Sequence, residues 1–336
     1  MATPEPLERH RELIATAMRA AVGRLAPSVQ EAASYHLGWQ GVGGNEVNGN
    51  GGKAIRPAIV LLAAEAAGAR AERALDGAVA LELVHNFSLL HDDVMDGDRE
   101  RRHRPTVWVL FGVARAIVAG DAMLTLSQEL LLEGEGDRKR AAAAELSRAT
   151  AEMIRGQCDD LAFESRSDMT IDQGVRMSMR KTGALLGCAG ALGAILAGAG
   201  ADQISALRTY GRELGIAFQA IDDVLGIWGD PAATGKPAAN DLRRRKKTLP
   251  VLHALRLSTV SAERELTGLL NGDDVADGRL ERAVELLDQA GSRGWTLRLA
   301  ERHLERALSQ LEGCSLDGTA AADLRQVATF VTSRDF

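Results

Sequence analysis

Aromatic residues are scarce in this sequence, and cysteines are nearly absent. Phenylalanine, tyrosine and tryptophan make up 4% of the 336 residues. Strands favour aromatic and β-branched residues, whereas this chain is rich in alanine, leucine, arginine and glutamate, so we expect helices rather than a sandwich or barrel. The three cysteines have neither metal-ligand spacing nor the density of a disulfide framework. A reducing, cytoplasmic location fits this pattern best.

An excess of positive charge and a lipid-facing apolar run are missing as well. The net charge is −6, from 40 basic and 46 acidic residues, which gives no support to a nucleic-acid partner. Segment 182–201 carries no charge, but six of its residues are glycine and seven are alanine. It is too weakly apolar for lipid and suits a closely packed core helix. We expect a soluble protein without a signal peptide or stable membrane insertion.

Helical periodicity dominates from end to end, and no linker divides the chain. We expect one all-α domain over residues 1–336, with ten or more helices around a deep apolar cavity. The helices most relevant to function are expected at Arg73–Asp96, Ile171–Ala197 and Ser205–Ile227. A helix break is expected between Ala116 and Asp121, and no β-hairpin is expected. The Gly- and Asn-rich segment 41–52 is expected to be a mobile loop.

Two aspartate clusters follow apolar helical segments. The first is Asp92-Asp93-Val94-Met95-Asp96, and the second is Asp222-Asp223, where Gly226 occupies the third position. Residues four apart share a helix face, so Asp92 and Asp96 repel each other at a cost of roughly 0.2–0.5 kcal/mol. Such carboxylates require cations. Hard oxygen ligands suit Mg²⁺, which is usually completed by waters and substrate phosphates.

Five basic groups lie beside glycines, prolines or these acidic clusters. They are Lys53 with Arg56, Arg101 with Arg102, Lys181, Lys236, and the run Arg243–Lys247. Each group alone indicates only a solvated charge. Together with two acidic clusters, they supply the arginine and lysine donors that two diphosphate groups require.

In order and spacing, these motifs resemble the trans-polyprenyl diphosphate synthase family over nearly the whole chain. The motifs are Gly51-Gly52-Lys53-x-x-Arg56-Pro57, His85, Asp92-Asp93-x-x-Asp96, Arg101-Arg102, Gly156-Gln157-x-x-Asp160, Lys181-Thr182, Phe218-Gln219-x-x-Asp222-Asp223, Gly235-Lys236-Pro237, and Asp241-Leu242 through Lys246-x-Thr248-Leu249-Pro250. The resemblance implies the isoprenoid synthase fold and a homodimer. It also implies the 1′–4 trans condensation of isopentenyl diphosphate with an allylic prenyl diphosphate.

The resemblance further implies a role for each matching residue. The Mg²⁺ ligands would be Asp92, Asp96 and Asp222, with three ions per site and Mn²⁺ able to replace Mg²⁺. The cations for the allylic diphosphate would be Arg101, Lys181, Lys236 and Lys246. The residues for isopentenyl diphosphate would be Lys53, Arg56, His85 and Arg102. As further catalytic groups, the backbone near Lys181 and Thr182 and the side-chain amide of Gln219 would face the allylic cation with their dipoles, and the released diphosphate would take the final proton.

Gly226 departs from the family pattern, because a third aspartate usually occupies this position. Asp230 lies too far along the helix to replace it. Three interpretations stay open: a synthase that binds Mg²⁺ through Asp222 and water, a class I terpene cyclase on the same scaffold, and a non-catalytic subunit that regulates a partner. The intact isopentenyl diphosphate motifs favour the synthase.

Product length in this family often depends on the residue five positions before the first aspartate. Here that residue is Phe87, next to Ser88. A bulky side chain there is typical of short-chain members, so we predict geranylgeranyl diphosphate as the product, with farnesyl diphosphate next. The alternative is that Phe87 only packs between helices.

Overall fold

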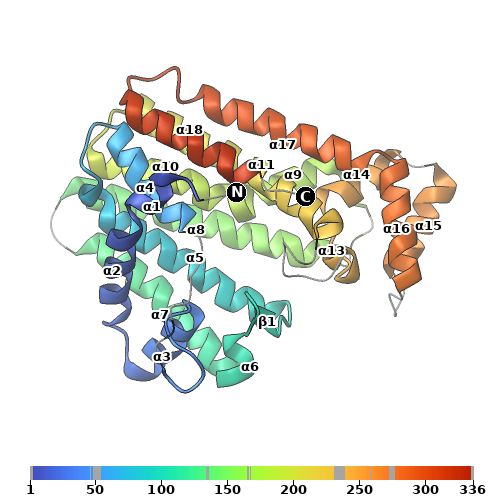
Figure 1. The fold of residues 1–336 in the computed structure, drawn as a ribbon, viewed down its shortest axis with the longest axis horizontal. Helices are drawn as coiled ribbons and strands as arrows, with labels where there is room; N and C mark the ends of the chain where they lie inside the picture. The colour runs from blue at the N-terminus through green and yellow to red at the C-terminus, as the bar shows by residue number, and fades with distance from the viewer. Residues whose placement is uncertain are drawn as a thin grey trace.

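The apolar residues of this sequence gather on helices that pack against one another along the whole chain (Figure 1). The computed structural model describes residues 3–45, 47, 54–133, 136–164, 166, 168–230, 239–257, 259–271 and 277–333. The first helices are α1 (Glu5–Arg9), α2 (Arg11–Val22), α3 (Pro27–His36), α4 (Ile55–Ala66), the 3₁₀ turn η1 (Ala71–Ala74), α5 (Leu75–Met95), α6 (Val107–Phe111), α7 (Val113–Leu132) and α8 (Asp137–Glu164). They are followed by α9 (Ile171–Ser178), the π-helical turn η2 (Met179–Gly183), α10 (Ala184–Ala197), α11 (Ala201–Trp228), α13 (Asn240–Arg243), α14 (Leu249–Leu257), α15 (Val260–Asn271), α16 (Asp277–Gln289), α17 (Ser292–Ser309) and α18 (Gly318–Thr332).

One large hydrophobic cluster joins the two ends of the chain. It contains Leu7 near the N-terminus and Val331 near the C-terminus, together with the buried faces of α4, α5, α7, α10 and α11. A smaller cluster around Leu242 and Leu287 lies where α13 to α16 meet, at one end of the molecule in Figure 1. The prediction of an all-α, single-domain fold is confirmed, whereas the depth of its cavity stays a prediction.

The charge-free helix α10 lies in the middle of this packing, against α11, α4 and α8. Every residue from Leu185 to Leu196 is buried. Its glycines permit close contact: a Cβ at Gly190 would overlap the backbone of Leu207, and a Cβ at Gly211 of α11 would overlap the carbonyl of Leu186. The prediction of a closely packed core helix is thus confirmed. None of the described helices is long and apolar enough to span a bilayer.

The structure corrects several predicted boundaries. The break expected between Ala116 and Asp121 is wrong, because α7 runs through these residues and the chain turns earlier, at Gly112, whose φ is +84°. Helices α3 and α15 were not predicted. The hairpin of β1 (Glu100–Arg101) and β2 (Arg104–Pro105) was not predicted either, since each strand has only two residues and no alternating pattern marks it. Of segment 41–52, only residues 41–45 and 47 are described.

The close approach of α10 and α11 generates a stability prediction. We expect Gly211→Ala to lower the free energy of unfolding by about 1–3 kcal/mol, because the added methyl group has no space beside Leu186. Gly268→Ala in α15 is the matched control: no atom lies within 4 Å of its added Cβ, so the better helix propensity of alanine should stabilise by about 0.5–1 kcal/mol. Urea denaturation measures both, and a loss at position 268 equal to that at 211 would contradict the packing argument.

Candidate active site

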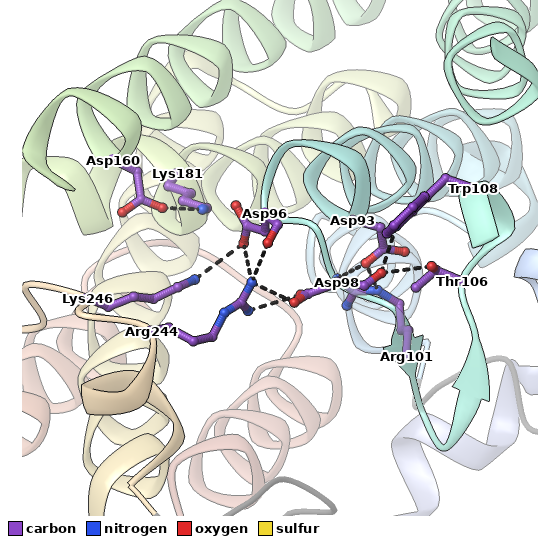
Figure 2. Close-up of polar contacts among 10 residues, drawn as sticks. All are labelled: Asp93, Asp96, Asp98, Arg101, Thr106, Trp108, Asp160, Lys181, Arg244 and Lys246. Carbon is purple, nitrogen blue, oxygen red and sulfur yellow. Dashed lines mark hydrogen bonds and ion pairs between the residues drawn. The ribbon is translucent and has the colours of Figure 1, made fainter. Parts of the chain in front are cut away.

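The first aspartate cluster lies at the C-terminal end of α5, where its three carboxylates separate. Asp93 is buried and accepts hydrogen bonds from Arg101, with Nε at 2.8 Å and Nη2 at 2.7 Å from its Oδ1 (Figure 2). Asp92 and Asp96 share the other face, as the spacing predicts. Burial raises the pKa of Asp92 to about 6, and the charge of Asp96 adds to this effect. The site therefore contains two crowded carboxylates that a divalent cation would stabilise.

Cationic side chains from two other segments lie near these carboxylates, and Figure 2 shows them around Asp96. Lys246 Nζ lies 3.4 Å from Asp96 Oδ2, and Arg244 Nη2 lies 3.6 Å from the same oxygen. Lys181 donates to Asp160 at 2.6 Å. Burial lowers the pKa of Lys181, but the charges of Asp160 and Asp92 outweigh burial and raise it above its ordinary value. Lys181 is therefore a fixed positive charge facing Asp92.

A π-helical turn presents Lys181 and Thr182 to the site. The wider turn of η2 covers Met179–Gly183, and such insertions are frequent at functional sites. Gly156 of α8 allows this placement, because a Cβ there would lie 2.5 Å from the Lys181 backbone nitrogen. The glycine of the Gly156-Gln157-x-x-Asp160 motif thus provides close contact, and its aspartate provides the partner of Lys181.

The second cluster, on α11, is part of a buried polar chain. Thr182 Oγ1 donates to Gln219 Oε1 at 2.7 Å, and Gln219 Nε2 donates to Asp223 Oδ1 at 2.8 Å. The backbone N–H of Leu249 donates to Asp223 Oδ2 at 3.0 Å. Burial raises the pKa of Asp223 to about 7. Asp223 therefore orients Gln219 and the start of α14, whereas the less buried Asp222 stays the predicted metal ligand.

Gly226 brings an unexpected carboxylate into the site. A Cβ at this position would overlap the side chain of Asp241, which comes from α13. Asp241 thus occupies the space in which a side chain at 226 would begin. The sequence comparison of the two clusters missed this residue, because Asp241 lies fifteen positions further along the chain and outside the helix.

Two of the residues predicted for isopentenyl diphosphate, Arg56 and His85, come together beside the middle of α5. Arg56 Nη1 lies 3.1 Å from His85 Nε2. Burial, and then the charges of Arg56 and Arg102, lower the pKa of His85 well below its ordinary value, so its imidazole is neutral and accepts from Arg56. Lys53 and Lys236, which were also predicted to bind diphosphates, lie outside the described residues.

Phe87 is buried between α5 and α7, one turn before the first cluster. Its ring meets the edge of His91 with centroids 5.0 Å apart, and His91 Nε2 lies 3.1 Å from the Ile117 carbonyl oxygen. The neighbouring Ser88 Oγ donates to the His85 carbonyl at 2.8 Å. Phe87 is thus held firmly, which suits a tunnel floor and equally satisfies helix packing.

Among the described residues, no three acidic, histidine or cysteine side chains gather into a metal cage. Mg²⁺ does not require such a cage, since it commonly binds one or two carboxylates plus substrate phosphates. The oxygen donors of Asp92 and Asp96 beside several cations fit a metal-bridged diphosphate. Arg244 and Asp98 also belong to this site, and sequence reasoning missed both. Within the run Arg243–Lys247, only Lys246 was predicted to bind diphosphate, and the other residues were interpreted as a solvated face. The position of Arg244 soon after the second cluster could have indicated its place in the site.

Comparisons with known proteins agree with this geometry. The sequence pattern that defines polyprenyl synthetases matches residues 44–287. The chain is 46% identical over 326 residues to the (2E,6E)-farnesyl diphosphate synthase of Mycobacterium tuberculosis, covering 96% of this chain and 91% of that relative. It is 40% identical over 332 residues to the geranylgeranyl diphosphate synthase of the same organism, covering 98% and 93%. Its fold is similar to that of a polyprenyl synthetase from Streptomyces coelicolor, with a TM-score of 0.92 and 44% identity over 97% of this chain and 98% of that one.

The different surroundings of Asp222 and Asp223 generate a prediction. Asp223→Ala removes the acceptor for Leu249 and Gln219 in a buried place, so we expect the free energy of unfolding to fall by about 2–4 kcal/mol. Asp223→Asn retains an oxygen for Leu249 and should cost about 1 kcal/mol. Asp222→Ala is the matched control, with an expected cost below about 1 kcal/mol. Equal losses for the two alanine variants in urea denaturation would show that Asp223 has no special structural role.

Proposed function

Because this chain belongs to the polyprenyl synthetase family of prenyltransferases, we propose that it condenses isopentenyl diphosphate with an allylic prenyl diphosphate. The bond formed is 1′–4 and trans, and the product is a short-chain prenyl diphosphate. The observation that carries the proposal is the placement of Asp92 and Asp96 beside Lys181 and Lys246, which together complement a metal-bridged diphosphate.

Loss of the diphosphate from the allylic substrate is the step that these residues would assist. Asp92, Asp96 and Asp222 would hold Mg²⁺, which when bound supplies Lewis-acid stabilisation of the leaving diphosphate. Lys181 and Lys246 add fixed positive charge where negative charge develops on the bridging oxygen. Arg101 contributes at the same edge of the site while its bond to Asp93 keeps it in place. Asp241, beside Gly226, brings a further carboxylate to the side of the second cluster.

Thr182 and Gln219 would face the allylic cation with dipoles and without a strong nucleophile. The Thr182 hydroxyl is already committed as a donor to Gln219, and the Gln219 amide is fixed by Asp223. Their oxygen lone pairs would stabilise positive charge. The released diphosphate would take the proton lost from C2 of the isopentenyl unit as the new double bond forms.

Isopentenyl diphosphate would bind at Arg56, His85 and Arg102, with Lys53 as a fourth group. Two guanidinium groups beside a neutral imidazole give fixed donors for phosphate oxygens. These groups favour a synthase over a terpene cyclase or a non-catalytic subunit, because neither alternative needs a second diphosphate site.

A second copy of the chain is the proposed partner. Four large apolar side chains of α6 and α7 are 37–52% exposed: Leu110, Val113, Ile117 and Val118. Exposed apolar side chains on adjoining helices are a common feature of protein interfaces. It supports the homodimer implied by the sequence resemblance. The cytoplasmic location stays a prediction.

One assay separates the three interpretations. We expect incorporation of labelled isopentenyl diphosphate with Mg²⁺ and at least one allylic starter, giving farnesyl (C15) or geranylgeranyl (C20) diphosphate. The C20 product was predicted first, whereas the relative with 46% identity is named for the C15 product, so the measured chain length decides between them. Chelation of the metal should abolish turnover. A hydrocarbon formed from geranylgeranyl diphosphate alone would indicate a cyclase, and no turnover with any starter would indicate a non-catalytic subunit.

The tunnel-floor assignment generates a further prediction. We expect Phe87→Ala to lengthen the product by at least one isoprene unit, because removal of the ring opens space below the first cluster. Chromatography of the dephosphorylated products measures this length. Phe330→Ala in α18 is the matched control, since it removes a ring of similar burial away from α5 and should leave product length unchanged. An unchanged product from Phe87→Ala would leave Phe87 with a packing role only.

A further inference from the structure

Arg244 lies where the first aspartate cluster meets the segment that follows the second cluster (Figure 2). Its Nη1 donates to Asp98 Oδ2 at 3.0 Å, and its Nη2 lies 2.5 Å from Asp98 Oδ1, so the guanidinium and the carboxylate form a bidentate pair. The same Nη2 donates to the Asp96 carbonyl oxygen at 3.1 Å and lies 3.6 Å from the Asp96 carboxylate. This arginine thus contacts a predicted metal ligand from a position 148 residues away in sequence.

Asp98 is itself fixed by the surrounding backbone and side chains. Its N–H donates to the Asp93 carbonyl at 2.9 Å. Its carbonyl accepts from Thr106 Oγ1 at 2.7 Å and from Trp108 Nε1 at 2.8 Å (Figure 2). The backbone of Asp98 is therefore fixed, and its carboxylate holds the guanidinium in the bidentate pair.

The segment that carries Arg244 is also well defined. Leu242 of α13 is fully buried, and the Lys246 N–H donates to the Asp241 carbonyl at 2.9 Å. Arg245 has a φ of +56°, a left-handed conformation that turns the chain between Arg244 and Lys246. Both cations consequently approach Asp96 from one side.

The hydrogen bonds of Arg244 leave part of its donor capacity unused. A guanidinium has five N–H donors. Asp98 and the Asp96 carbonyl accept three of them, and no acceptor for the other two is recorded among the described residues. When the Asp96 carboxylate binds a metal ion that carries the diphosphate, Arg244 would still be paired with the Asp98 carboxylate. The guanidinium would then lie beside the diphosphate, and either its Nε–H or its second Nη1–H would donate to a phosphate oxygen.

Resting on the proposed function, we propose that Arg244 binds the allylic diphosphate and that Asp98 is its positioning residue. In the metal-free protein the same guanidinium shields the Asp96 carboxylate. The charge of Arg244 therefore opposes binding of a bare divalent cation and favours binding of the metal together with diphosphate.

Calorimetric titration with inorganic pyrophosphate at saturating Mg²⁺ tests this role without requiring turnover. We expect Arg244→Gln to weaken pyrophosphate binding by about ten- to hundred-fold, the range for loss of charge-assisted hydrogen bonds. Arg244→Lys should recover part of the affinity through its charge. Asp98→Asn should weaken binding by about three- to ten-fold, because the guanidinium remains but loses its bidentate anchor. Arg243→Gln is the matched control: it removes the same charge one residue away, on an exposed side chain, and should stay within about two-fold of wild type.

For binding of a bare metal ion, we expect the opposite effect of the Arg244→Gln substitution. Titration with Mn²⁺ alone, followed by electron paramagnetic resonance, should show tighter binding to Arg244→Gln than to wild type or Arg243→Gln, because the cation that shields Asp96 is gone. Pyrophosphate affinities equal in Arg244→Gln and Arg243→Gln would overturn the role of Arg244 alone. A wild-type protein that binds no Mg²⁺–pyrophosphate would overturn the proposed function together with this inference.

Discussion

The repulsion between Asp92 and Asp96 is the constraint on which the site depends. The two carboxylates lie one turn apart at the end of α5, whose buried face belongs to the core, and burial makes the charge of Asp92 costly. Without a metal, the protein compensates with cations from distant segments. Lys181 comes from the π-helical turn, and Lys246 and Arg244 come from the residues after the second cluster. In the proposed function, these cations would pair with the diphosphate when it binds. The metal-free structure therefore already places positive charge beside the proposed diphosphate site.

In each pair of adjacent aspartates, the more buried residue makes the structural hydrogen bonds. Asp93 binds Arg101 and fixes the loop that carries Asp98, whereas Asp223 holds Gln219 and the first turn of α14. Both are buried; Asp223 accepts hydrogen bonds with both carboxylate oxygens, whereas Asp93 accepts from Arg101 with Oδ1. Their neighbours Asp92 and Asp222 are more exposed. Because successive helical residues point about 100° apart, an adjacent pair can supply one carboxylate for structure and, in the proposed function, one for the ligand.

A carboxylate from another helix lies where the second aspartate cluster lacks one. The second cluster, on α11, lacks a third carboxylate, since residue 226 is glycine. The absence of a side chain there lets α13 approach, and α13 brings the carboxylate of Asp241 into the same space. The segment that follows then turns Arg244 and Lys246 toward α5. Loss of a side chain at one position is therefore linked to the placement of three charged groups from another segment.

Much of this protein followed from sequence alone. Composition and helical period predicted the all-α fold, the glycine content of 182–201 predicted a core helix, and the spacing of Asp92 and Asp96 predicted their shared face. These features depend on local geometry, which the order of residues determines. Only the tertiary structure determined the features that depend on long-range contacts. It assigned Asp93 and Asp223 to structural hydrogen bonds and placed Asp241 beside Gly226. It also brought Arg244 onto Asp98 across 146 positions. No periodicity within one helix encodes such a contact, because it arises only when separate helices pack and bring their ends together.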